Sequence, residues 1–481
     1  MAFSLAAQLQ LRDSPGGFRL PEHETFKARW RQFRADLGNG LDFQSILSSG
    51  DELRRVFLLA ALSSEPTLCS PGICSTLDEH IITQLFESLF GKEALAPVSL
   101  IFFWMDNPWG YLCEPSSLDA ILGGAELLRG ATALDQPLAQ LARHCHLRAS
   151  ASDSFLSAAR LIDDCLLLRS CTRGLVITPS AAAPAISDAI SRFVAVATLS
   201  LSVRCSVINV YPIEVAFGYR AKDRWFEAFV SDVQRRGGDA IKMLGFDLAR
   251  GSIQDRDGLW KAFVAKKQFA ELVDLAMLDG LQERSASSVQ NRYEAFGPIA
   301  HCTECYERAA SFDLPGNRLL CEPCNWKASV GAKVLQKARK VDGQSFLDEA
   351  DSLAAIAITC DPFYSVFAEP SSLSTAISAA QRSSNAISMA LGEVGMALPR
   401  TCLFSRLSAS EALLLVRRDD LGRCSALLES VLRRDLKAQG GNGNTEVRLG
   451  FSGGEQVVPI RVLVREAVSS AQTGKGKVIR A

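Results

Sequence analysis

Two CxxC pairs, fifteen residues apart, constrain this chain more than any other feature of its sequence. Cys302 and Cys305 form the first pair, and Cys321 and Cys324 form the second. Four thiolates from two such turns can surround a Zn²⁺ ion tetrahedrally and leave no ligand position open for water. The spacing therefore predicts a structural zinc site, and the alternative is four unrelated buried cysteines in a cysteine-rich chain. A closed site of this kind stabilises its surroundings but does not define an activity.

Length and composition indicate a globular protein of several domains. The chain has 481 residues, of which 48% are hydrophobic and 22% charged, and a chain this long exceeds a single core. Its net charge of −1 excludes a global attraction to nucleic acid or membrane, so such contacts would need local basic patches. No apolar run reaches the length of a membrane span. Because no secretory signal is evident and the other ten cysteines are scattered, we expect reduced thiols and a cytoplasmic location.

Changes in hydrophobic periodicity predict four segments and an α+β fold. We expect a mainly helical N-terminal domain over 1–145, an α+β domain over 146–250, a helical module with the zinc cysteines over 251–350, and a second α+β domain over 351–481. In the first domain, the apolar stretch 98–112 is interpreted as buried core. In the second, the sequence predicts helices over 152–170 and 184–199 and strands over 174–180 and 204–220.

The last segment carries the clearest topology. Its pattern of apolar strands and amphipathic helices follows the order β-α-β-β-α-β, which is the ferredoxin-like arrangement. The basic and acidic run 417–420 follows a strand and is interpreted as the start of a helix. The predicted strands cover 352–361, 400–407, 411–416 and 446–452, and the predicted helices cover 371–391, 420–436 and 459–472.

Basic side chains gather near the zinc cysteines. Directly after them, residues 325–341 form a predicted helix, and an earlier helix over 261–281 begins with a basic cluster. A basic helix beside a zinc knuckle is a candidate contact for a phosphate backbone, whereas a solvated face is the alternative. The candidate nucleic-acid contacts are Lys327, Lys333, Lys337, Arg339 and Lys340, together with Lys266 and Lys267.

The layout resembles the large signature subunit of type III CRISPR–Cas effector complexes, a family with paired polymerase-type palm domains. The stretch 155–170, followed by 174–184, is similar to the first palm of the Cmr-type branch; Phe155, Ala159, Arg160, Asp164 and Ser170 fit its helix pattern. The CTEC and CEPC pairs fit the zinc module of the family. The stretches 354–361 and 443–467 are similar to the first strand and the late strand, loop and helix of the catalytic palm.

The resemblance implies two ferredoxin-like palm domains flanking the zinc module, and the departures from it bear on activity. In cyclase-active members a Gly-Gly-Asp-Asp hairpin holds Mg²⁺ against the phosphates of ATP. The matching positions here read Ser408-Ala409-Ser410-Glu411, so Asp361, Ser410 and Glu411 mark a degenerate site. The His-Asp dyad of the family's nuclease domain and the helical domain that usually follows the palm are also expected to be absent.

The resemblance therefore implies a catalytically silent large subunit that works in antiviral defence. Its implied partners are a guide RNA and target nucleic acid, a CRISPR backbone subunit and small helical subunits, with no membrane. Two alternatives remain open. One is a divergent cyclic-oligoadenylate synthase that uses Asp361 and Glu411, and the other is a stand-alone zinc-ribbon RNA-binding adaptor.

Overall fold

The computed structural model describes a large part of the chain, which divides into two compact units. One unit comprises Met1–Leu100, Ile208–Leu278 and Val366–Ile377, and the other comprises Ile101–Val207, Asp279–Ser365 and Ser378–Ala481. Beyond a few single positions, the described residues are 23–38, 97–134, 165–211, 300–340, 344–348, 352–361, 373–438, 446–453, 458–473 and 475–480.

In the first unit, helix α2 (His23–Gly38) lies in the N-terminal segment that the sequence predicts to be mainly helical. Its aromatic side chains form a small cluster: the ring of Phe57 lies 5.2 Å from that of Trp30 and 5.5 Å from that of Phe33, centroid to centroid. Phe33 is almost fully buried. Helix α2 therefore has an apolar side, which packs within its own unit.

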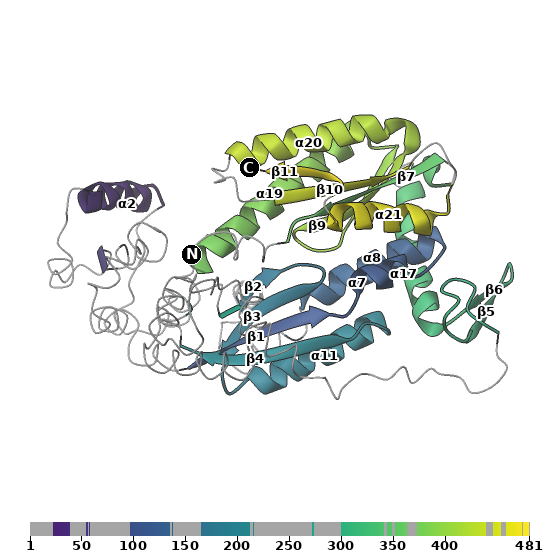
Figure 1. The fold of residues 1–481 in the computed structure, drawn as a ribbon, viewed down its shortest axis with the longest axis horizontal. Helices are drawn as coiled ribbons and strands as arrows, with labels where there is room; N and C mark the ends of the chain where they lie inside the picture. The colour runs from purple at the N-terminus through teal and green to yellow at the C-terminus, as the bar shows by residue number, and fades with distance from the viewer. Residues whose placement is uncertain are drawn as a thin grey trace, which may run out of the picture. The chain divides into compact units, whose positions relative to one another are not determined.

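The first sheet contains four strands in the order β2-β3-β1-β4 (Figure 1). Along the chain, helices α7 and α8 follow β1, and helix α11 lies between β3 and β4, so the element order is β-α-β-β-α-β. Ile186, Ile190 and Val194 of α11 are buried in the same core as Val176 and Val203 of the strands. The elements are β1 (Val98–Met105), α7 (Pro108–Cys113), α8 (Leu118–Ala133), β2 (Leu166–Arg169), β3 (Arg173–Pro179), α11 (Ala183–Thr198) and β4 (Val203–Val210).

Two features of this sheet differ from the prediction. Val98–Met105 is a strand between β3 and β4, whereas the sequence placed it in a mainly helical domain over 1–145. Leu166–Arg169 pairs antiparallel with β3, whereas the sequence extended a helix through residue 170. Both segments are short apolar runs whose periodicity does not separate strand from helix, so pairing with the neighbouring strand decides their structure.

The second sheet has five strands in the order β11-β10-β7-β9-β8, with every neighbouring pair antiparallel. The first four strands along the chain and their helices confirm the predicted β-α-β-β-α-β order, while β11 was not predicted. The run Arg418–Asp420 is a 3-10 turn that leads directly into α20, as expected. The elements are β7 (Leu353–Thr359), α19 (Leu373–Ala397), β8 (Cys402–Arg406), β9 (Glu411–Arg417), α20 (Leu421–Ala438), β10 (Glu446–Ser452), α21 (Ile460–Gln472) and β11 (Lys477–Arg480).

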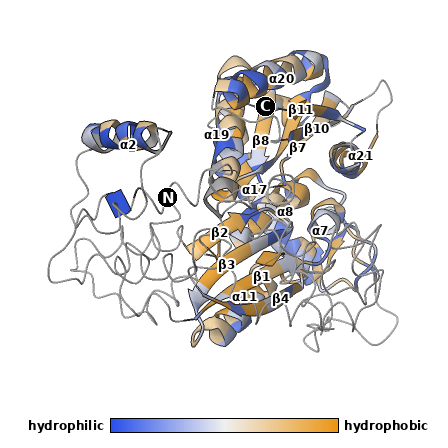
Figure 2. Ribbon diagram, turned by 60° about the vertical axis from the view of Figure 1, so that its left-hand side comes forward, coloured by the Kyte–Doolittle hydropathy of each residue, from blue (hydrophilic) through white to orange (hydrophobic). Residues whose placement is uncertain are grey.

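Both faces of this second sheet are buried. Ile356 and Leu414 belong to the core that contains residues of α19 and α20. Their neighbours Ala355 and Leu413 belong to another core, which α21 and the first sheet share. Burial on both faces explains why β7 and β9 are continuously apolar instead of alternating, and Figure 2 shows the hydrophobic character of the strands.

The cysteine module joins the two sheets through a close pair of helices, α8 and α17 (Figure 1). A Cβ atom at Gly123 of α8 would lie 1.7 Å from the backbone oxygen of Lys327, and one at Gly331 would lie 1.7 Å from that of Asp119. The two glycines therefore allow backbone-to-backbone approach that any side chain would prevent. The module consists of β5 (Phe312–Leu314), β6 (Arg318–Leu320) and α17 (Glu322–Lys340), followed by the 3-10 turn η2 (Ser345–Asp348).

Among the helices that the structure describes, none combines the length and the hydropathy that a membrane span requires.

Candidate metal centre and the joint between the sheets

The four cysteines predicted to bind metal come together in space. Their sulfur atoms all lie within 4.8 Å of one another, and all four residues are buried. The Sγ atoms of Cys305 and Cys321 are 3.9 Å apart, while a tetrahedral zinc site with bonds of about 2.3 Å has sulfur–sulfur edges of roughly 3.8 Å. The arrangement can therefore hold one metal ion with four thiolate ligands.

Local backbone structure positions these sulfurs. The first pair lies on a knuckle closed by a hydrogen bond from the N–H of Tyr306 to the oxygen of Cys302. The second pair lies at the start of α17, where the N–H of Asn325 donates to the oxygen of Cys321. Between them the β5–β6 hairpin turns through Gly316 (φ 85°) and Asn317 (φ 57°). Glycine and asparagine are the residues that adopt this left-handed conformation most readily.

The surroundings of the cysteines suit a negatively charged metal–thiolate cluster. Hydrogen bonds from the other three thiols hold the pKa of Cys302 below its usual value. Nη1 of Arg308 lies 4.0 Å from Sγ of Cys305. Among the described residues the buried Tyr111 hydroxyl has no hydrogen-bond partner, and its pKa is raised by burial first and then by the nearby Glu114 and Cys324. The Arg308 cation close to the sulfurs would offset part of the negative charge of a thiolate cluster.

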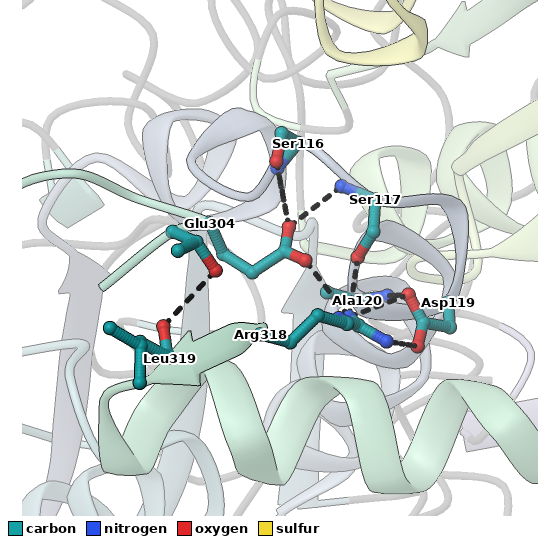
Figure 3. A network of polar contacts seen from close by, with 8 residues as sticks. Ser116, Ser117, Asp119, Ala120, Glu304, Arg318 and Leu319 are labelled. Atoms are coloured by element: carbon teal, nitrogen blue, oxygen red, sulfur yellow. Dashed lines mark hydrogen bonds and ion pairs between the residues drawn. The ribbon is translucent and has the colours of Figure 1, made fainter. Parts of the chain in front are cut away.

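A polar network attaches the knuckle to the first turn of α8 (Figure 3). Oε2 of Glu304 accepts hydrogen bonds from the N–H groups of Ser116 (2.9 Å) and Ser117 (2.8 Å), while its Oε1 accepts one from Arg318 (2.8 Å). Arg318 also pairs with Asp119 at 3.0 Å. Glu304 is 4% exposed, so a carboxylate between two metal-ligand positions caps the N-terminus of a helix. No motif or spacing marks Glu304 for this role.

Lys327 does not take the predicted role of a nucleic-acid contact. Its side chain is fully buried, and its Nζ atom donates to the backbone oxygen of Tyr111 at 2.7 Å and to Oε2 of Glu114 at 2.9 Å. It also lies 3.6 Å from the centroid of the Tyr111 ring. A buried lysine is stable only with such partners, and Lys327 acts as a link between α7 and α17.

The other predicted basic contacts divide into three groups. Lys333 and Lys337 are exposed on α17. Arg339 is also exposed but pairs with Asp348 at 2.5 Å. The side chain of Lys340, and Lys266 and Lys267, lie outside the described residues.

Asp361, Ser410 and Glu411, which the resemblance marks as a degenerate site, lie at the joint between the two sheets. Asp361 forms an ion pair with Arg173 at the start of β3, and the Arg173 guanidinium also lies over the ring of Phe363. Glu411 is 5% exposed; its Oε2 accepts hydrogen bonds from the N–H of Cys171 and from Oγ of Ser408, each at 2.5 Å. Each carboxylate that the sequence singled out is therefore held by a group from the first sheet.

Serine hydroxyl groups close the turn before β9 and attach it to the first sheet. Oγ of Ser408 accepts from the N–H of Ser410 at 3.2 Å, and Oγ of Ser410 donates to the backbone oxygen of Arg169 at 3.5 Å. Burial raises the pKa of Glu411 to about 7, although the hydrogen bonds from Ser408 and Cys171 oppose this shift. Sequence reasoning found Asp361, Ser410 and Glu411 but not Arg173 and Cys171, which no motif marks.

Neither a protein-family model nor a curated protein matches this chain. Among solved structures, a chain of the apo Csm1–Csm4 cassette is similar at 12% identity and a TM-score of 0.40, over 82% of this chain and 56% of that chain. A chain of the Csm1–Csm4 cassette in complex with cA3 is similar at 12% identity and a TM-score of 0.39, over 82% of this chain and 57% of that chain. A chain of the Csm1–Csm4 subcomplex in the type III-A CRISPR-Csm interference complex is similar at 12% identity and a TM-score of 0.38, over 82% of this chain and 57% of that chain. The likeness is loose at these values, and it does not show a function.

Proposed function

We propose that this chain is a catalytically silent large subunit of a type III-like CRISPR–Cas ribonucleoprotein. In this role it helps to assemble the complex and contacts guide and target nucleic acid in antiviral defence. The two α+β halves act as palm domains of the Cmr-type branch, and the cysteine module between them binds structural Zn²⁺. The partners are a backbone subunit and small helical subunits.

The observation that carries the proposal is the state of the two carboxylates at the joint. Metal-dependent nucleotidyl transfer needs carboxylates that are free to bind Mg²⁺ beside an accessible nucleotide. Here Asp361 pairs with Arg173, and Glu411 is buried under the N–H of Cys171. The pairing supports a structural role for both carboxylates, in which they join the sheets.

The cysteine module supports the assembly role. Tetrahedral thiolate ligands favour zinc or an iron–sulfur cluster, and the closed, buried site fits the structural zinc that the spacing predicts. Its network through Glu304 and Arg318 attaches the knuckle to α8. Zinc would therefore stabilise the helix pair that lies between the two palms.

Purification of the tagged chain from its native host tests the proposal. We expect it to carry a guide RNA and CRISPR subunits in fixed ratio, identified by sequencing and mass spectrometry. A chain that purifies alone, without RNA or Cas partners, would contradict the proposal and favour the stand-alone zinc-ribbon adaptor.

One observation favours the divergent synthase as a second candidate. The side chain of Asp361 remains 43% exposed, so this carboxylate would be available to a metal ion if Arg173 moved away. Such an enzyme would need the joint to open, because Glu411 is only 5% exposed in the closed form and its carboxylate is held by Cys171 and Ser408. Cyclic product from ATP that is lost on Asp361→Ala would establish this alternative.

A further inference from the structure

The exposed face of α17 carries positive charge without acidic side chains to offset it. After Glu322 in the first turn, the helix sequence contains no aspartate or glutamate. Lys333 and Lys337 are exposed, and neither has a carboxylate partner in the part of the chain that the structure describes. Counter-charges are absent from this face of α17 itself, which favours a polyanionic ligand.

An aromatic side chain lies in line with these lysines. Trp326 precedes Lys333 by seven residues and Lys337 by eleven, so at 100° per residue all three lie within about 20° of one line along the helix. Trp326 is 43% exposed, and its Nε1 donates to the backbone oxygen of Ala197 at 3.1 Å. That hydrogen bond fixes the orientation of an indole that is still partly open to solvent.

We propose that the exposed face of α17 binds single-stranded nucleic acid. Lys333 and Lys337 bind two successive phosphates, and Trp326 stacks on one base. Basic side chains interleaved with an aromatic platform are the usual construction of sites for single strands. Only the identification of the bound strand as RNA rests on the proposed function.

The test measures the affinity of the purified full chain for a fluorescent 12-nucleotide RNA by anisotropy, at several salt concentrations. Each phosphate neutralised on a single strand contributes about 0.7 to the slope of log K against log salt. Lys333→Gln with Lys337→Gln should therefore reduce that slope by about 1.4. The matched control, Arg423→Gln with Lys437→Gln on exposed positions of α20, should leave slope and affinity unchanged.

Substitutions that do not alter charge test the contacts to bases. Trp326→Ala should weaken binding roughly tenfold with the slope unchanged, because stacking is insensitive to salt. Trp326→Phe keeps an aromatic face and should retain most of the affinity, which separates stacking from loss of the hydrogen bond to Ala197.

Single-stranded DNA of the same sequence should bind with similar affinity, and duplex RNA more weakly. Equal binding of the duplex, an unchanged slope in the lysine variant, or an equal fall in the α20 control would overturn the proposal. If the chain purifies with guide RNA and Cas subunits but these variants bind RNA normally, the surface is wrong while the proposed function stands. If these variants lose binding but no Cas partner copurifies, the surface is right and the proposed function is wrong.

Discussion

The backbone N–H of Cys171 donates a hydrogen bond of 2.5 Å to Oε2 of Glu411 and so joins the hairpin of the first sheet to that of the second. The two residues are 240 positions apart in sequence, and both are buried. Beside them Arg173 pairs with Asp361. The joint between the sheets is therefore closed by carboxylates that a nucleotidyl-transfer site would need for metal.

Protonation of Glu411 should make stability depend on pH. Burial raises the pKa of this carboxyl to about 7 from the ordinary 4.5, so the folded chain binds its proton more tightly than the unfolded chain. The stability that this group contributes is therefore complete below about pH 4.5 and is lost as the pH rises through about 7. We expect a loss of about 2 to 3 kcal/mol between these limits, measured by urea unfolding at each pH.

Glu411→Gln provides the control for this dependence. The amide keeps the size of the side chain and does not titrate, so the fall in stability between pH 5 and 8 should become markedly smaller. A variant whose pH profile matches that of the natural chain would show that Glu411 does not titrate in this range.

Two glycines of α8 should respond in opposite ways to the same substitution. Gly123→Ala places a methyl group 1.7 Å from the backbone oxygen of Lys327 and should destabilise the chain by about 3 kcal/mol or more, because the helices must separate. Gly130→Ala meets nothing within 4 Å and should stabilise by about 0.4 to 1 kcal/mol. Thermal unfolding of the two variants measures the difference, and equal effects would contradict the close helix packing.

Glu304 should stabilise the chain far more than its neighbour Glu307. Glu304→Ala removes the acceptor for the N–H groups of Ser116 and Ser117 and leaves Arg318 without one of its carboxylates. We expect a loss of about 2 to 3 kcal/mol in the free energy of unfolding. Glu307→Ala, on an exposed position of the same knuckle, should change it by less than about 0.5 kcal/mol.

Metal content depends on the four clustered cysteines. We expect one zinc per chain by elemental analysis, and none after Cys302→Ser or Cys321→Ser, because three thiolates no longer close the tetrahedron. The same variants should unfold at lower temperature and assemble less well. Cys113→Ser, which changes a cysteine outside the cluster, should keep its zinc; full zinc in Cys302→Ser would contradict the site.

Sequence patterns predicted the elements that have strong local signals. The spacing of Cys302 and Cys321 with their partners located the cysteine cluster. The apolar strands β7, β9 and β10 with their helices revealed the topology of the second half. These features depend on residues close in sequence, whose periodicity reflects their own burial.

The features that sequence patterns missed depend on distant residues. Val98–Met105 is apolar except for Ser99, and its position between β3 and β4 makes it a strand. Lys327 occurs in a basic run, yet its position on the helix turns it towards Tyr111 and Glu114. Arg173 and Cys171 carry no motif, because their roles arise only when the two hairpins meet.

Activity with ATP tests the central claim most directly. The ribonucleoprotein, purified from its native host, is incubated with ATP, Mg²⁺ or Mn²⁺ and matching target RNA, and nucleotide products are separated by mass spectrometry. If Asp361 and Glu411 serve to join the sheets, no cyclic oligoadenylate forms. Cyclic product that disappears in the Asp361→Ala variant would contradict the account and identify the joint as an active site.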